Sequence, residues 1–342
     1  MGKDTAISWT HHTFNPWWGC VKVSDACTHC YAETFAERWP ASRGLWGKGG
    51  NRRFQSGKYW DAPLKWERDA AAAGERRRVF CASMADVFED RADLVPHRAR
   101  LFDLIRRTPH LDWLLLTKRP ENVMRQISDC GSWNRNTPTG WDIATGAWMR
   151  SWLDGTPPAN IWLGTTVENQ EQADKRIPAL LKIRAKVRFL SCEPLLGPVD
   201  LISVIIKGPQ TGRLPGATQG MPFDCLRAIA YHEDGATPDP IAGRIDWVIC
   251  GGESGPHARP MHPDWARGLR DQCANARVPF HFKQWGKWYP IARTDGIHEN
   301  PFGPFLTGTK PPFGFFTGKD HDRLLDGILH DAFPNCSIDD LL

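Results

Sequence analysis

Three cysteines lie within eleven residues of one another, and they are the side chains best suited to hold a metal. Cys20, Cys27 and Cys30 occur in the segment WWGCVKVSDACTHCYAE with the spacing C-x6-C-x2-C and no fourth cysteine nearby. Three thiolates suit a 4Fe-4S cluster, whose fourth iron then stays open to an external ligand. The sequence therefore predicts an iron–sulfur site at these three cysteines.

A structural zinc ion is the alternative for the same cysteines. Such an ion takes four Cys or His ligands, and His11, His12 or a distant cysteine could supply the fourth. His29 lies inside the short C-x2-C step, so it is poorly placed to share one ion with both of its neighbours. Iron–sulfur, zinc and no metal all remain open, in this order of preference.

Six short apolar runs further along the chain end in polar residues. They are RVFCAS (78–83), DWLLLTKR (112–119), NIWLGTTVEN (160–169), VRFLSCEPL (187–195), DWVICGGESG (246–255) and PFHFKQWG (279–286). Most of them alternate with segments of helical apolar spacing, which predicts an α/β fold of βα units with parallel strands. The opening AISWT (6–10), with the cysteine loop and the helix-like YAETFAERW (31–39), is a seventh candidate unit.

The polar residues after these runs predict a shared ligand crevice. In barrels and open α/β sheets, ligands bind beyond the carboxyl ends of the parallel strands, and the cysteine loop would open onto the same crevice. For any single strand, a polar end is explained equally well by the strand stopping there. The predicted cofactor-binding residues are Ser83, Asp86, Lys118, Glu168, Ser191, Glu193, Gly251, Gly252, Glu253, Ser254, Lys283 and Gln284.

The pattern of runs indicates a single α/β domain over residues 1–290. Two stretches rich in Gly, Pro, Thr and Asp, at about 130–159 and 202–243, interrupt the pattern and are predicted to be insertions. Residues 291–342 carry many Phe, Gly and Pro with little periodicity, so we expect an irregular C-terminal extension.

Composition limits the class of protein. The 342 residues are 41% hydrophobic and 24% charged, which is typical of a globular domain. No signal peptide and no apolar run of about 18 residues is present, so we expect a cytoplasmic protein without a membrane partner. Ten cysteines in a reducing compartment favour metal binding or catalysis over disulfides. The net charge of +4 allows an anionic partner without requiring one.

A three-cysteine loop after the first strand of a βα array resembles the site of radical S-adenosyl-L-methionine enzymes. The resemblance implies a partial (β/α)6-7 TIM-like barrel, in which the open iron is chelated by the amino and carboxylate groups of S-adenosyl-L-methionine. One electron from an external donor then cleaves a C–S bond of this cosubstrate and releases a 5′-deoxyadenosyl radical. The spacing here differs from that superfamily's usual C-x3-C-x2-C by three extra residues in the first loop.

Five motifs in order resemble an uncharacterised three-cysteine-motif family found in bacteriophages and bacterial mobile elements. They are FNP with the three cysteines and CYAE (14–33), LTKRPE (116–121), SCEPLLGP (191–198), GGESGP (251–256) and FKQWG (282–286). The resemblance covers about residues 5–288 and implies radical chemistry. Its phage setting implies DNA modification, or more broadly a nucleotide or nucleic-acid substrate.

The same residues suggest roles toward the cosubstrate. The two glycines of the GGES turn (251–254) would allow a close backbone approach to its adenosyl or amino-acid portion. Glu168 and Glu193 could accept hydrogen bonds from ribose hydroxyls or an ammonium group, or could instead cap helices. Lys118, Arg119 and Lys283 could hold a carboxylate or a phosphate.

Two functions from other classes remain as alternatives. One is a nucleic-acid-binding protein with a structural zinc or iron–sulfur site and no radical chemistry, favoured by the basic patches at 51–53 and 76–78 and by the many aromatic residues. Among these, Trp17, Trp18 and Trp285 could stack on a base or could pack in the core. The other is a hydrolase with structural cysteines, although no H-E-x-x-H or G-x-S-x-G motif is present. The iron–sulfur enzyme is the preferred interpretation.

Overall fold

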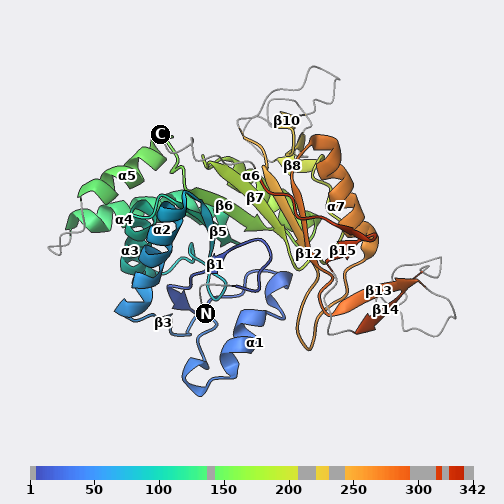
Figure 1. Ribbon diagram of the computed structural model, residues 1–342, viewed down its shortest axis with the longest axis horizontal. Helices are drawn as coiled ribbons and strands as arrows, with labels where there is room; N and C mark the ends of the chain where they lie inside the picture. The colour runs from blue at the N-terminus through green and yellow to red at the C-terminus, as the bar shows by residue number, and fades with distance from the viewer. Residues whose placement is uncertain are drawn as a thin grey trace, which may run out of the picture.

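A seven-stranded parallel sheet organises the structure, which is a computed structural model describing residues 5–136, 143–206, 221–230, 243–292, 313–317 and 323–334. The sheet curls into a half-barrel with helices on its outer side (Figure 1). Its order is β1 (His12–Thr13), β4 (Arg77–Cys81), β5 (Leu111–Thr117), β6 (Ile161–Thr166), β7 (Val187–Cys192), β11 (Trp247–Gly251) and β12 (Phe280–Gln284). The predicted α/β class and partial TIM-like barrel are confirmed.

Helices supply the crossovers that parallel strands require. Helix α3 (Val95–Arg106) links β4 to β5, α6 (Gln170–Leu181) links β6 to β7, and α7 (Pro263–Ala276) links β11 to β12. Between β5 and β6 the chain forms two helices, α4 (Val123–Asn136) and α5 (Ile143–Leu153), which pack on each other and on α3. Helix α2 (Ala62–Ala73) precedes β4, and α1 (Tyr31–Glu37) follows the cysteine loop. Among the described residues, no helix is long and apolar enough to span a bilayer.

Both faces of the sheet are buried, which is why its strands appear as continuous apolar runs. On β5, Trp113 and Leu115 face the helices while Leu114 faces the inside of the half-barrel. The inner face is filled by Trp9, Phe80, Leu114, Trp162, Val187, Phe189, Trp247 and Ile249. Gly164 on β6 leaves room for this filling, because a Cβ there would lie 2.4 Å from the ring of Phe189.

The first strand begins later than the sequence predicts. Residues 6–10 do not form a strand, because the chain turns at Ser8 and Trp9. Trp9 is buried inside the half-barrel, and its ring lies 4.6 Å from the ring of Phe80. The strand β1 follows this turn, and His12 pairs in parallel with Val79.

The predicted insertions and extension are described only in part. Residues 130–159 include the end of α4 and all of α5, and 137–142 lie outside the described residues. Within 202–243, β8 (Val204–Ile206), β9 (Met221–Asp224) and β10 (Ile229–Ala230) form an antiparallel sheet, and 207–220 and 231–242 lie outside. Strand β13 (Trp288–Ala292) begins just before the predicted extension and pairs with β14 (Phe313–Thr317), and within the extension β15 (Leu324–Leu325) pairs with β16 (Ile328–Leu329).

Candidate functional site

One cavity of about 340 Å³ opens at the carboxyl ends of the parallel strands. This volume lies in the range of small-molecule sites, roughly 300–1,000 Å³. All three cysteines of the loop line the cavity. Ten of the twelve predicted cofactor-binding residues also line it: Ser83, Asp86, Lys118, Ser191, Glu193, Gly252, Glu253, Ser254, Lys283 and Gln284. The other two, Glu168 and Gly251, are not among the lining residues.

The cysteine loop leaves the short strand β2 (Trp17–Trp18), which pairs with β3 (Arg53–Phe54), and runs along the cavity. Cys20 comes first, Cys27 ends the 3-10 helix η1 (Asp25–Cys27), and Cys30 directly precedes α1. All three thiols are free and half-buried. The helical turn of η1 shortens the path between the first two cysteines, so the long spacing still returns the chain to one cavity.

The three thiols can be compared with the ligand set of a single zinc ion and with that of a 4Fe-4S cluster. A tetrahedral zinc holds its sulfur ligands about 2.3 Å from one point. In the described part of the chain, no three His, Cys, Asp or Glu side chains come together in this way. Each thiolate of a four-iron cluster binds a different iron, so the sulfurs stand around a larger body. Three thiols around one cavity meet that requirement in number and in kind.

The two histidines suggested as a fourth zinc ligand lie elsewhere. The ring of His12 stacks on Trp66 with 4.4 Å between the centroids, and Nδ1 of His11 accepts a hydrogen bond from the backbone N–H of Arg78. Both histidines line a separate cavity together with Asp69. The structure therefore does not place either histidine beside the cysteines.

A buried ion pair lies next to the first cysteine. Asp86 accepts hydrogen bonds from the Thr117 hydroxyl at 2.7 Å and from a guanidinium N–H of Arg119 at 2.8 Å. Arg119 also directs two nitrogens at Sγ of Cys20, at 3.7 and 3.8 Å, and donates to the carbonyl of Val21 at 2.7 Å. The guanidinium therefore links the carboxylate to the sulfur.

Burial and the charge of Arg119 have opposing effects on the pKa values of Asp86 and Cys20. Burial favours a higher pKa for Asp86, but the Arg119 charge and the hydrogen bonds hold the pKa of that carboxyl below its ordinary value. Burial, and then the charge of Asp86, raise the pKa of Cys20 to about 12 against the effect of Arg119. A metal-bound thiol is deprotonated outright, and Arg119 is the cation that would face the resulting thiolate.

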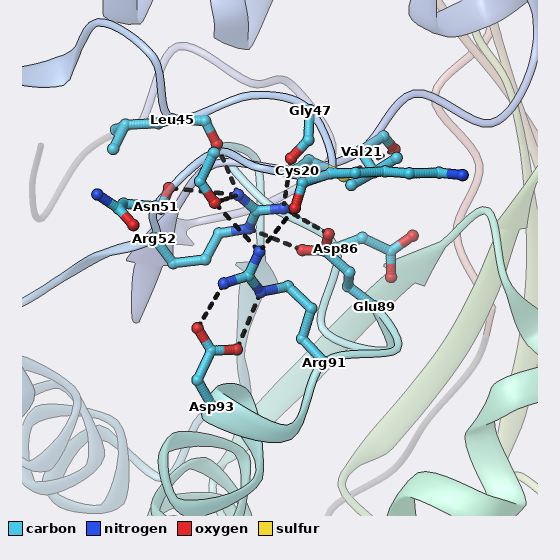
Figure 2. A network of polar contacts seen from close by, with 12 residues as sticks. Cys20, Val21, Leu45, Gly47, Asn51, Arg52, Asp86, Glu89, Arg91 and Asp93 are labelled. Carbon is cyan, nitrogen blue, oxygen red and sulfur yellow. Dashed lines mark hydrogen bonds and ion pairs between the residues drawn. The ribbon is translucent and has the colours of Figure 1, made fainter.

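A second buried pair fixes the backbone around Cys20 (Figure 2). Arg52 donates to both carboxylate oxygens of Glu89, at 2.5 and 2.9 Å, and to the carbonyl of Leu45 at 2.7 Å. The loop that Arg52 holds includes Gly47, whose N–H donates to the carbonyl of Cys20 at 2.9 Å. The cysteine thus sits between two buried arginine–carboxylate pairs.

Glu168 lies behind the cysteine loop and does not face the cavity. Its carboxylate is fully buried and pairs with Arg176 of α6 at 2.7 Å. A carboxylate buried so completely requires a cationic partner, which explains why it does not reach toward a ligand. Its other oxygen accepts the N–H of Ala26 at 3.4 Å, so the residue supports η1.

Glu253 lines the cavity, but its oxygens are occupied by Arg259. The Arg259 Nη2, Nε and backbone N–H groups donate to it at 2.7, 2.9 and 2.8 Å. The same guanidinium donates to the carbonyl of Asp25 at 2.9 Å. This second carboxylate therefore also holds η1. Arg259 was not predicted, although it lies only three residues after the GGESGP motif.

The close approach at the GGES turn is made by the chain itself. A Cβ on Gly252 would lie 1.9 Å from the carbonyl oxygen of Trp285. Gly286, with φ of +85°, crosses beside it, and a Cβ there would lie 2.3 Å from the carbonyl oxygen of Glu253. A Cβ on Gly251 would meet the carboxylate carbon of Glu193 at 3.3 Å. Gly252 and Gly286 are explained by two crossing backbone segments, and Gly251 by the side chain of Glu193.

Solvent-accessible polar groups remain on the other side of the cavity. Lys283 and Glu193 form an ion pair at 2.6 Å, with side chains 22% and 17% exposed. Gln284 donates to Ser254 Oγ at 2.9 Å. Among the described residues, the ammonium group of Lys118 has no hydrogen-bond or ion-pair partner. These groups can bind a carboxylate, an ammonium or hydroxyls of a small molecule.

The lining also includes residues outside the predicted set. Tyr31 and Trp46 both face the cavity. The Tyr31 hydroxyl donates to the carbonyl of Ser83 at 2.8 Å, and the Asn15 amide donates to Oγ of Ser83 at 3.0 Å. The position of Tyr31 directly after Cys30 could have suggested its role, whereas Trp46 lies in a segment without periodicity. Trp17, Trp18 and Trp285 are buried in packing contacts.

Comparison with known proteins adds a family and one distant structure. No curated protein matches the chain. A solved structure of a mutant of spore photoproduct lyase is similar at 12% sequence identity, covering 81% of this chain and 76% of that chain with a TM-score of 0.36. A family profile matches residues 4–334, a wider span than that of the five motifs. The chain belongs to the family described as "Protein of unknown function (DUF5131)".

Proposed function

We propose that the protein is a radical S-adenosyl-L-methionine enzyme with a 4Fe-4S cluster bound by Cys20, Cys27 and Cys30. One observation carries the proposal: three free thiols, without a fourth among the described lining residues, share a cavity with polar groups suited to a cosubstrate. When bound and reduced, the cluster supplies the electron that cleaves the C–S bond of S-adenosyl-L-methionine into methionine and a 5′-deoxyadenosyl radical.

The chain's own residues would hold the cosubstrate by charge. Lys118 offers an ammonium without a partner among the described residues, which suits a carboxylate. Glu193 can exchange its contact with Lys283 for the ammonium or the ribose hydroxyls of the ligand, because this pair is partly exposed. Glu168 and Glu253 do not take part, since their oxygens pair with buried or half-buried arginines.

The surroundings of the thiols favour a stable, shielded site. Arg119 places a positive charge beside Cys20, which offsets the cost of a partly buried thiolate. The apolar filling of the half-barrel lies below the cavity and excludes water from that side. We further propose a nucleotide or nucleic-acid substrate, an external electron donor and a cytoplasmic location.

Anaerobic reconstitution tests this function. The full chain should bind S-adenosyl-L-methionine, change its electron paramagnetic resonance spectrum on binding, and form 5′-deoxyadenosine slowly when dithionite is added. Lys118→Ala should weaken cosubstrate binding, whereas Lys182→Ala, an exposed residue at the end of α6, is the matched control. A cluster that neither binds the cosubstrate nor changes its spectrum would contradict the proposal.

A further inference from the structure

Exposed aromatic side chains gather in one short segment. Among the described residues, the large aromatics that are exposed are Tyr31, Phe35, Trp39 and Phe54, at 53%, 37%, 57% and 38%. We call three of these side chains, Tyr31, Phe35 and Trp39, the aromatic face, because the ring of Phe54 stacks on His97 of α3. Other tryptophans of this region, such as Trp17 and Trp60, are buried. Buried packing sites for aromatic rings therefore exist in this region, and a lack of them does not explain why these four side chains are exposed.

Helix α1 is oriented with its large residues outward. Tyr31 and Phe35 lie one turn apart, about 6 Å along one side of the helix, and Trp39 follows in extended backbone two residues beyond the last residue of α1. The inward side carries Ala32 and Ala36, both buried. Burial in folding favours the opposite arrangement, so an outward row of aromatics indicates a binding surface.

The aromatic face is surrounded by positive charge. Residues 31–58 contain six basic and two acidic residues, and of the basic side chains only Arg52 is buried. The guanidinium of Arg38 lies 6.0 Å from the ring centroid of Phe35. Exposed basic side chains at 43, 48, 53 and 58 extend this charge along the loop that follows α1. The surface is thus complementary to a polyanion that also has planar groups.

The aromatic face leads to the cavity. Tyr31 lines the cavity and directly follows Cys30, and Trp46 lines the same opening. Figure 1 shows α1 at the lower edge of the molecule, apart from the helices α2 to α4 that cover the sheet. A flexible chain bound along α1 would therefore pass the mouth of the cavity.

We propose that the aromatic face binds single-stranded nucleic acid and presents a nucleotide to the cavity. Unpaired bases stack on aromatic rings while their phosphates meet basic side chains, a combination that duplex nucleic acid or an acidic protein does not use. The proposal rests on the proposed function for the chemistry inside the cavity, but the docking itself requires neither cosubstrate nor reductant.

Binding of a fluorescent 20-nucleotide single strand to the full chain tests the docking. Phe35→Ala with Trp39→Ala should weaken binding by about 30-fold or more. Lys48→Gln should weaken it less and lower its dependence on salt. The matched controls, Ile328→Ala for exposed apolar surface and Lys182→Gln for charge, should bind like the parent protein. Equal melting temperatures establish that the variants are folded.

Three outcomes would overturn the docking proposal: absence of binding at low salt, unchanged affinity in the aromatic double variant, or equal binding of duplex DNA or polyglutamate. Cys20→Ala separates this proposal from the proposed function. It should remove the iron but keep strand binding, because the aromatic face contains none of the metal ligands. A chain that forms 5′-deoxyadenosine yet binds no strand would refute the docking alone.

Discussion

Replacing Glu253 by glutamine keeps the shape of the side chain and removes its charge, and we predict a loss of stability. The side chain is 4% exposed and accepts three hydrogen bonds from Arg259. Losing the charge on such a group should lower the free energy of unfolding by roughly 1.5–3 kcal/mol. For a chain of 342 residues, the unfolding entropy is about 0.7 kcal/mol per degree, so the melting temperature should fall by about 2–4 °C.

The matched change Glu193→Gln should have little effect on stability. Glu193 and Lys283 are both partly exposed, and such a pair contributes about 0–1 kcal/mol to stability. Its melting temperature should change by less than about 1.5 °C. If Glu193 contacts the cosubstrate, loss of a charge-assisted hydrogen bond should weaken binding by about ten- to a hundredfold.

Thermal unfolding and equilibrium binding of S-adenosyl-L-methionine, measured on the same two anaerobic preparations, separate these effects. The structure predicts that Glu253→Gln binds normally per folded molecule and that Glu193→Gln melts normally. The opposite result, with the stability loss in Glu193→Gln and the affinity loss in Glu253→Gln, would refute the assignment of the two carboxylates.

Three further predictions concern the sulfur contact, the pH dependence and the packing. Arg119→Lys keeps a positive charge but loses the paired N–H contacts to sulfur, so redox titration should show a lower potential for the reconstituted cluster. Burial, followed by nearby arginines, lowers the pKa of His281 to about 3. Since the unfolded side chain titrates near pH 6.5, about 2 kcal/mol of stability should be lost from pH 7 to 5 in urea unfolding, and His281→Gln should lose less. Gly164→Ala should destabilise by roughly 1–3 kcal/mol through overlap with Phe189, whereas Gly268→Ala in open helical space should stabilise slightly.

The sheet could be predicted because its strands are buried on both faces. Runs such as LDWLLLT carry apolar residues on both faces of the strand, so they stand out from the amphipathic helices between them. The first strand was misplaced because AISWT has the composition of a strand while Trp9 fills the barrel interior from a turn. Side-chain packing, which has no periodic signal in the sequence, decided that boundary.

The location of the site could be predicted from the sequence, but the pairing of charged side chains within the site could not. Polar residues at strand ends had to converge once the strands were parallel. Which carboxylate faces a ligand depends on arginines that come from other elements, such as Arg176 on α6 for Glu168. The Arg119 contact to Cys20 joins residues 99 positions apart. Sequence spacing carries no information on such long-range pairs.

Metal content tests the central claim most directly. Protein purified and reconstituted without oxygen should contain about four irons per chain with broad visible absorption, as expected for a 4Fe-4S cluster. Cys20→Ala, Cys27→Ala and Cys30→Ala should each abolish this, whereas Cys225→Ala, at a buried cysteine far from the loop in sequence, should not. Stoichiometric zinc without iron, or iron retained in all three loop variants, would contradict the account.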